Sequence, residues 1–226
     1  MTKARGRVGR PRGENTENAN RRRKQLIDAA VESIVEHGLS ATTLATVAKA
    51  SGLSQGTAVF YFKSKESLLS EAFRYRLEEY RETWIEALSS AGSDPVDRIV
   101  ALVFAVLDPR LLTTHNLALW NFFWTEASKN ASLNDLSEQY DTERQEILLS
   151  LCADAHEYLS GAIWTPKTVA HILEMVIEGI WTRLYYSPDY ISDEEARMAA
   201  GTLLSAIFPS RSEDIMRRAT ETGNDN

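Results

Sequence analysis

The sequence has few features of a secreted or membrane-spanning protein. It contains one cysteine, Cys152, which excludes an intramolecular disulfide and fits a reducing compartment. Its longest uninterrupted apolar run, 99–107, is far shorter than the roughly 20 residues that a helix needs to cross a bilayer. The basic N-terminus is not followed by an apolar stretch, so we expect no signal peptide. These absences predict a cytoplasmic protein without membrane contact.

Catalytic and metal-binding patterns are scarce as well. Cys152 and His156 are one helical turn apart, but two ligands without a second cluster do not make a zinc site. His171 and Glu174 are equally incomplete, and no third group orients a Cys–His nucleophile pair. We therefore expect no enzyme, no metal and no cofactor.

Strand-like alternation, internal repeats and Gly-rich phosphate loops are also missing, and helical periods with clear boundaries take their place. Asp94-Pro95 and Thr165-Pro166 each place a cap before a proline at the first helical position. The SDEE stretch at 192–195 is a capping box, and Pro209 ends the last major helix. We expect an all-α chain with about nine helices, including helices over about 110–129 and 132–160.

Charge is distributed unevenly along the chain, although the formal net charge is −7. Residues 1–65 carry 12 Lys and Arg against 5 Asp and Glu, whereas residues 66–226 carry 13 against 27. The first part therefore has a net charge of +7 and the second part −14. A basic N-terminal part on an acidic body predicts an anionic partner for the N-terminal part alone, with nucleic acid as the leading candidate.

The stretch SGLSQGTAVFYFKSKESL, residues 51–68, contains two features that a helix does not need for its own packing. Gly56 stands one step inside an expected helix, where glycine costs roughly 1 kcal/mol relative to alanine. Three consecutive aromatic residues, 60–62, spread over about 200° of the helix surface, so one buried face cannot accommodate all of them. Both features indicate use by a partner outside the fold.

Two short helices joined by ASGLS have the layout of a helix-turn-helix, whose second helix enters the major groove of DNA. Gly56 would allow close approach to the phosphate backbone, with Gln55 and Thr57 beside it to contact bases. The other expected roles are packing against the first helix for Phe62, a phosphate contact for Tyr61, an apolar groove contact for Phe60, and phosphate anchoring for Lys63 and Lys65. The alternative is a helical hairpin with an aromatic core.

The run from Arg23 to Leu69 closely resembles the N-terminal domain of TetR-type transcriptional regulators, through GLSATTL, VAKASGLSQGT and YFKSKESLL. The resemblance implies a three-helix DNA-binding domain and a homodimeric repressor that leaves a palindromic operator when a small molecule binds. Two positions depart from the family pattern: Val59 replaces a frequent Tyr, and Ala45 a frequent basic residue. The DNA contacts carried over by position are Thr43, Ser54, Gln55, Gly56, Thr57, Phe60, Tyr61 and Lys65.

The N-terminal segment contains GRPRG, residues 9–13, which looks like the core of an AT-hook. In that interpretation Arg10 and Arg12 enter a narrow minor groove. A solvated basic tail that adds non-specific affinity explains the same residues. The expected domains are a disordered basic arm (1–18), a helix-turn-helix domain (19–65), a ligand-binding and dimerisation domain (66–210) and a C-terminal tail (211–226).

The acidic body contains two aromatic helical segments, LALWNFFWTEAS and EMVIEGIWTRLYY. Aromatic residues at this spacing usually form plain core, but the repeated carboxylates of Glu174 and Glu178 do not fit that interpretation. The second segment therefore faces solvent or a partner subunit, or it lines a polar cavity.

These two segments resemble the C-terminal domain of BetI-like regulators within the TetR family, whose best-known effector is choline. Aromatic faces with nearby negative charge recognise quaternary ammonium groups. The resemblance places the dimer contact on 166–186 and 193–208, where the small residues 199–201 allow close packing, either between subunits or within one. Trp181 then faces either the ligand or the interface. The expected ligand-binding residues are Trp120, Phe123, Trp124, Tyr140, Glu178 and Trp181.

Two functions remain at this point. The first is a ligand-responsive regulator in which effector binding shifts the population of conformations, with the helix over 64–90 as the link to the DNA-binding part. The second is a constitutive or architectural DNA-binding dimer without effector control. A cavity of a few hundred Å³ lined by the named aromatic residues would favour the first.

Overall fold

The structure is a computed structural model that describes residues 12–159 and 164–220, with side chains from residue 16 onward. The chain divides into two compact units, Met1–Ala72 (unit 1) and Phe73–Asn226 (unit 2). The described residues form ten α-helices and two 3-10 turns and contain no strand, which confirms the all-α prediction. The unit boundary falls at 72/73, whereas the sequence placed the domain boundary at 65/66.

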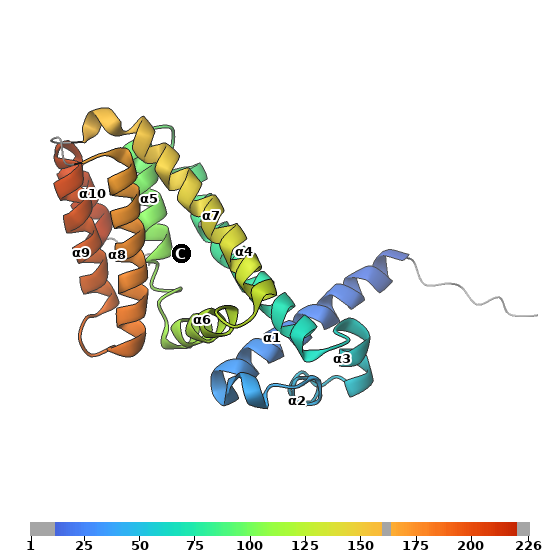
Figure 1. The fold of residues 1–226 in the computed structure, drawn as a ribbon. Helices are drawn as coiled ribbons and strands as arrows, with labels where there is room; N and C mark the ends of the chain where they lie inside the picture. The colour runs from blue at the N-terminus through green and yellow to red at the C-terminus, as the bar shows by residue number, and fades with distance from the viewer. Residues whose placement is uncertain (1–11, 160–163, 221–226) are drawn as a thin grey trace, which may run out of the picture. The chain divides into compact units, whose positions relative to one another are not determined.

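Unit 1 contains three helices and the start of a fourth, all visible in Figure 1: α1 (Arg12–Ala41), α2 (Leu44–Ala50), α3 (Gln55–Tyr61) and α4 (Lys65–Ser90). α1 begins at Arg12, inside the segment expected to be a disordered arm. The apolar period from Leu26 onward anchors this helix, and the preceding Ala, Glu and Arg residues have the propensity to extend it.

Glycines end the regular helical path at two places in unit 1. Gly38 has φ 77° and interrupts α1, and Gly52 has φ 70° in the turn between α2 and α3. Only glycine adopts such positive φ values readily, so these two positions are required by the chain path. The Thr42 hydroxyl donates to the Gly38 carbonyl at 3.0 Å and lies 3.0 Å from the buried Ser33 hydroxyl. The apolar core of unit 1 consists of Leu26, Ile27, Ala30, Val31, Ile34, Val47, Ala48, Ala58, Phe62, Leu68, Leu69 and Ala72.

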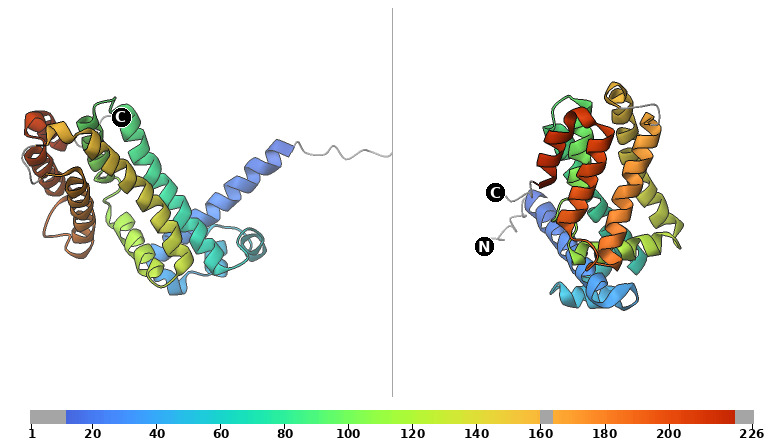
Figure 2. Two further views of the ribbon diagram at one scale, coloured as in Figure 1. Left: turned by 45° about the horizontal axis from the view of Figure 1, so that its top comes forward. Right: turned by 90° about the vertical axis from the view of Figure 1, so that its left-hand side faces the viewer.

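Unit 2 continues from α4 through six further α-helices. They are α5 (Pro95–Val106), α6 (Thr114–Ala127), α7 (Ala131–Asp154), α8 (Pro166–Tyr186), α9 (Asp193–Ile207) and α10 (Ser212–Thr220). α8, α9 and α10 lie beside one another, and α6 runs crosswise to α8 and α5 (Figure 1). Figure 2 shows α8 and α9 side by side on one face of unit 2.

Side-chain caps fix most helix starts where the sequence predicts them. Asp94, Thr165 and Ser192 each accept hydrogen bonds from backbone N–H groups of the first turn, and Ser192 forms the full capping box. Two starts differ from the prediction. α6 begins four residues after Arg110, because Thr113 caps it, and α7 begins at Ala131, because Asn130 accepts from Ser132 N at 3.1 Å.

The C-terminal segment expected to be a tail forms α10 instead. Ile215 and Ala219 are one turn apart and both are buried, which gives this short helix an apolar face. A Cβ added at Gly201 would lie 2.8 Å from the Ala219 Cβ, so the small residue at 201 serves packing within one chain. Of the two alternatives for the small residues, packing within one subunit therefore applies at Gly201, and Ala200 is likewise buried within the chain.

None of the helices in the described part of the chain is both long enough and apolar enough to span a bilayer.

Candidate DNA-binding surface and effector cavity

The turn between α2 and α3 has the geometry of a helix-turn-helix. The Thr43 hydroxyl accepts from Thr46 N at 3.1 Å and begins α2, and the Ser54 hydroxyl accepts from Thr57 N at 3.1 Å and begins α3. The Ser54 and Thr57 hydroxyls also lie 2.9 Å apart. These contacts orient the first turn of α3, where a recognition helix presents its residues to base edges.

The three consecutive aromatic residues of α3 and its C-cap occupy three different environments. Phe62 is 1% exposed and lies under the Arg23 guanidinium of α1, 5.8 Å from the ring centroid, in agreement with the predicted packing against the first helix. Phe60 is 77% exposed, and its ring meets the half-buried Tyr61 ring edge to face, with centroids 5.2 Å apart. Val59 is 45% exposed. The helical period therefore buries one aromatic residue and turns another outward.

The other predicted DNA contacts differ in their exposure and in whether their polar groups already form hydrogen bonds within the fold. Gln55, Gly56 and Lys63 are exposed on the surface of unit 1. Lys65 is half-buried and its ammonium group donates to the Leu39 carbonyl, so part of its hydrogen-bonding capacity serves the fold. Arg10 lies outside the described residues, and for Arg12 only the backbone, as the first residue of α1, is described.

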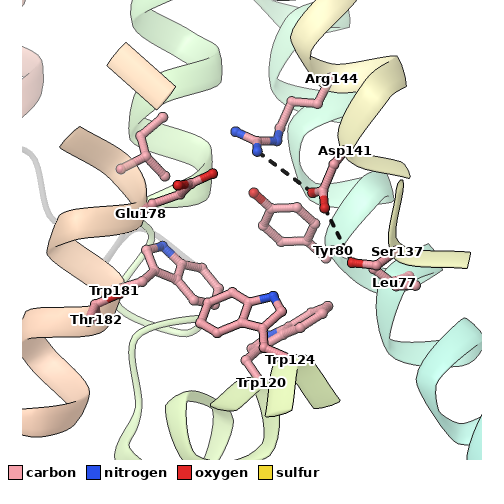
Figure 3. A pocket seen from close by; sticks show the side chains of 11 residues that line it. Leu77, Tyr80, Trp120, Trp124, Ser137, Asp141, Arg144, Glu178, Trp181 and Thr182 are labelled. Carbon is pink, nitrogen blue, oxygen red and sulfur yellow. Dashed lines mark hydrogen bonds and ion pairs between the residues drawn. The ribbon is translucent and has the colours of Figure 1, made fainter. Parts of the chain in front are cut away.

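Unit 2 contains a cavity of about 350 Å³ between four helices (Figure 3). This volume lies within the range of small-molecule sites. The lining residues are Leu77 and Tyr80 from α4, Trp120 and Trp124 from α6, Ser137, Asp141 and Arg144 from α7, and Ile177, Glu178, Trp181 and Thr182 from α8.

Four aromatic rings from three helices form one wall of the cavity. The Trp181 ring centroid lies 6.1 Å from Trp120 and 6.3 Å from Trp124, and the Tyr80 centroid lies 5.6 Å from Trp120. The Trp181 indole N–H donates to the Val106 carbonyl at 3.0 Å, which fixes the orientation of this ring. Trp124 is 40% exposed and Trp181 is buried, so the aromatic wall extends from the interior to the surface.

The charged residues that line the cavity are two acidic ones, Asp141 of α7 and Glu178 of α8, and one basic one, Arg144 of α7. The Ser137 hydroxyl donates to an Asp141 carboxylate oxygen at 3.2 Å, and an Arg144 nitrogen lies 3.8 Å from the other oxygen (Figure 3). Arg144 is buried and its two terminal nitrogens contact the Glu174 carboxylate at 2.9 and 2.7 Å. Glu174 therefore neutralises the charge of Arg144. The remaining charges of the cavity, those of Asp141 and Glu178, are negative.

Burial raises the pKa of several of these groups. Burial raises the pKa of the Asp141 carboxyl, and the positive charge of Arg144 opposes this effect only in part. Burial likewise raises the pKa of the Glu174 carboxyl. Burial raises the pKa of the Tyr80 hydroxyl to about 12, so this phenol is neutral at pH 7.

The structure places four of the six predicted ligand-binding residues around this cavity: Trp120, Trp124, Glu178 and Trp181. Phe123 is behind the wall, stacked on Phe73 with centroids 4.4 Å apart. Tyr140 lies to the side, where its hydroxyl donates to Glu78 at 3.3 Å. Neither of these two lines the cavity.

Seven of the lining residues were not predicted from the sequence, and the three polar ones on α7 form one group. Leu133 and Leu148 are buried on the inner stripe of this helix, and Ser137, Asp141 and Arg144 continue the same stripe at helical spacing between them. The signal that would have identified these three residues is their polarity, because they stand at positions of the helical period where a buried face has nonpolar residues. Tyr140, one position earlier, is turned by about 100° from that stripe.

The Cys152 and His156 pair does not form a common site. Cys152 is buried on α7, and burial raises the pKa of its thiol to about 12. His156 is exposed in the 3-10 turn His156–Tyr158. Across residues 12–159 and 164–220, no group of three or more His, Cys, Asp or Glu is arranged to hold a metal ion.

Comparison with known families gives a match for each unit. Residues 26–72 match the family described as bacterial regulatory proteins of the tetR family. Residues 95–209 match the family described as the C-terminal domain of BetI-type transcriptional repressors.

Curated relatives and solved structures agree with these matches. The HTH-type transcriptional regulator BetI of Paraburkholderia xenovorans strain LB400 is 30% identical over 190 residues, which cover 84% of this chain and 95% of the relative. That of Stenotrophomonas maltophilia strain R551-3 is 32% identical over 72% of this chain and 80% of its own.

Solved structures share the fold at lower identity. A putative transcriptional regulator from Saccharomonospora viridis, crystallised in complex with choline, superposes with a TM-score of 0.72 at 20% identity, over 82% of this chain and 96% of its own. A putative regulator from Pseudomonas aeruginosa PAO1 gives 0.72 at 18% identity, over 88% and 94%.

Proposed function

Because the chain belongs to the TetR family of bacterial transcriptional regulators and has a BetI-type C-terminal domain, we propose that it is an effector-controlled repressor. It binds a palindromic operator as a homodimer and releases it when a small quaternary ammonium cation, such as choline, enters the cavity of unit 2. Its family and its relatives are regulators of transcription and not enzymes. We place its action in the cytoplasm, where the operator DNA is.

The observation that carries the effector proposal is the combination of four aromatic rings and two carboxylates around one cavity. Tryptophan faces attract a cation that cannot donate hydrogen bonds, because the ring quadrupole is negative above its plane. Asp141 and Glu178 supply the opposite charge. The choline complex of the Saccharomonospora viridis regulator supports this ligand class, since that protein shares the fold.

α3 supports the DNA-binding proposal through its exposed face. Gln55 and Gly56 lie in its first turn, with Phe60 one turn further along. Residues 37–65 contain three Lys and no Asp or Glu, so the surroundings of α3 favour a polyanion. The predicted contacts at Thr43, Ser54, Thr57 and Tyr61 are retained in this proposal.

The route from effector to DNA is a shift in conformational population along α4. This helix begins at Lys65, four residues after α3 ends, and it supplies Leu77 and Tyr80 to the cavity. A ligand that binds more tightly to one arrangement of these side chains favours that arrangement. Release follows if the favoured state displaces the two α3 helices from successive major grooves, about 34–36 Å apart.

We assign the dimer contact to the outer faces of α8 and α9. Met175 and Tyr186 of α8 are exposed although they are large and apolar, and the space around the Gly179 Cα is open. Ala199 of α9 is exposed as well. Trp181 faces the cavity, so it takes part in ligand binding in this proposal and not in the dimer contact.

A constitutive DNA-binding dimer is the second candidate function. The cavity argues against it, because a domain that only dimerises has no need for an aromatic-lined space with carboxylates at its edge.

The experiment is a titration of the full-length protein with choline, followed by intrinsic fluorescence and thermal stability. Choline should stabilise the protein, and Trp124→Leu should weaken its binding by about ten-fold. Trp124 is partly exposed, so this change spares the core. Trp164→Leu is the matched control, since Trp164 is also partly exposed but lies outside the cavity.

A second ligand separates cation recognition from simple filling of an apolar space. The neutral carbon isostere of choline should bind much more weakly than choline. Equal binding of the two, or no binding of any quaternary ammonium, would contradict the proposed effector class.

A further inference from the structure

We propose that α3 selects operator sequences through thymine methyl groups, which contact the exposed Phe60 ring beside the bare backbone of Gly56. This inference rests on the proposed function, because it assumes that α3 enters the major groove. It adds the base chemistry that this helix recognises.

Phe60 has no packing role that would explain an aromatic residue at its position. Its neighbours Ala58 and Phe62 are buried, and Phe60 lies on the opposite side of α3 with 77% of its surface exposed. Val59 beside it is exposed too, so the outer face of α3 is apolar at its centre. The Tyr61 ring meets the Phe60 ring edge to face, which limits the directions that the outer ring takes.

Gly56 is not required by the fold. Its φ is not among the positive values of the chain, and a Cβ built at this position would meet only the Ser54 hydroxyl, at 3.7 Å. Alanine would therefore fit and would favour the helix by roughly 1 kcal/mol. The absence of a side chain leaves free space outside the helix, one turn before Phe60.

The two positions form a joint surface because helical side chains lean toward the N-terminus of their helix. The Phe60 ring therefore leans over the turn that contains Gly56, where no side chain covers the backbone. The result is an apolar ring beside a notch, which is the space that the missing side chain of Gly56 leaves on the outer face of the helix.

The charges near α3 and the apolar Phe60 ring indicate which group of the DNA this surface contacts. Lys49 of α2 and Lys63, which follows α3, are exposed, and no carboxylate occurs between residues 37 and 65. A phenyl ring accepts or donates no conventional hydrogen bond, so it cannot read the donor and acceptor pattern of a base. Thymine alone presents an apolar group in the major groove, its C5 methyl, and this group fits between the ring and the notch.

The test starts with selection of binding sites from random duplexes by the full-length protein. Each thymine of the selected site is then replaced by deoxyuridine, which lacks only the C5 methyl. At the position read by Phe60 the wild-type protein should lose affinity about four-fold for each methyl, the effect expected for one buried methyl-sized group.

Variants assign this loss to Phe60. Phe60→Ala should bind the thymine and deoxyuridine duplexes equally, and Phe60→Leu should keep a reduced preference. Lys63→Ala is the control, because loss of a phosphate contact should weaken both duplexes alike and leave their ratio unchanged.

The outcomes separate this inference from the proposed function. The methyl contact would be overturned if no deoxyuridine substitution in the selected site weakened binding of the wild-type protein. It would also be overturned if Phe60→Ala kept the full preference for thymine over deoxyuridine. In both cases the proposal that the protein binds DNA would stand. Failure to enrich any sequence would overturn the proposed function and the methyl contact together.

Discussion

The Asp141 carboxylate is held in the cavity by contacts from its own helix. Ser137 donates to one oxygen from one turn before, and Arg144 approaches the other oxygen from one turn after. Arg144 is also bound by Glu174 of α8, so it does not neutralise Asp141 fully. A half-buried carboxylate with incomplete compensation is suited to attract a cationic ligand.

This environment predicts a pH dependence of cation binding. Because burial raises the Asp141 pKa above the ordinary value of 3.8, the carboxyl takes up its proton at a higher pH than a solvated Asp does. The ionised form attracts the cation, so affinity for choline should fall as the pH is lowered through this raised pKa. A bound cation lowers the pKa again, and binding should therefore release protons in the same range.

Calorimetric titration in buffers of different ionisation enthalpy measures this proton release. Asp141→Asn should bind choline more weakly and with a flatter pH profile. An unchanged pH profile in the variant would show that another group is responsible.

Helices were predictable from the sequence where a cap and an apolar period coincide. Asp94, Thr165 and Ser192 each combine the two, and α5, α8 and α9 begin at the expected residues. α10 has only Ile215 and Ala219 as an apolar face, too little for a nine-residue helix to be stable alone. It forms by packing on α9, a tertiary effect that local sequence does not reveal.

The cavity was predictable only on its aromatic side. The tryptophans of α6 and α8 stand out in the sequence, whereas Tyr80 and the α7 residues lie in helices that look like ordinary charged surface. Which face of such a helix turns inward depends on the apolar anchors at its two ends, Leu133 and Leu148 in α7. The predicted residue Tyr140 is therefore one position away from Asp141, the residue that lines the cavity.

Gly201 tests the contact between α9 and α10. In Gly201→Ala the new methyl would lie 2.8 Å from the Ala219 Cβ, so α10 must move away. We expect the free energy of unfolding to fall by about 1–3 kcal/mol, measured by chemical denaturation. Adding Ala219→Gly should restore much of the loss; a single variant as stable as the wild type would contradict this packing.

Gly56 should show the opposite effect on stability. Gly56→Ala places a methyl in open space on α3, so the free energy of unfolding should rise by up to about 1 kcal/mol. Operator binding should weaken, because the methyl stands between the helix and the DNA. Denaturation and electrophoretic titration measure the two effects; unchanged DNA affinity would show that Gly56 does not face the groove.

In the molecule as a whole, the two functions are assigned to different units with different charge. Unit 1 holds the basic surface around α3, and unit 2 holds the acidic cavity. α4 belongs to both, because the division between the units falls within it at 72/73. Effector control therefore requires that occupation of the cavity alters how α4 presents the DNA-binding helices.

Release of operator DNA by choline tests this coupling most directly. The measurement is a titration of the complex between full-length protein and its selected operator, followed by fluorescence anisotropy of the labelled DNA. Choline should dissociate the wild-type complex, and Trp124→Leu should require about ten-fold more choline while binding the operator with unchanged affinity in its absence. An operator affinity that stays constant at saturating choline would contradict effector control through this cavity.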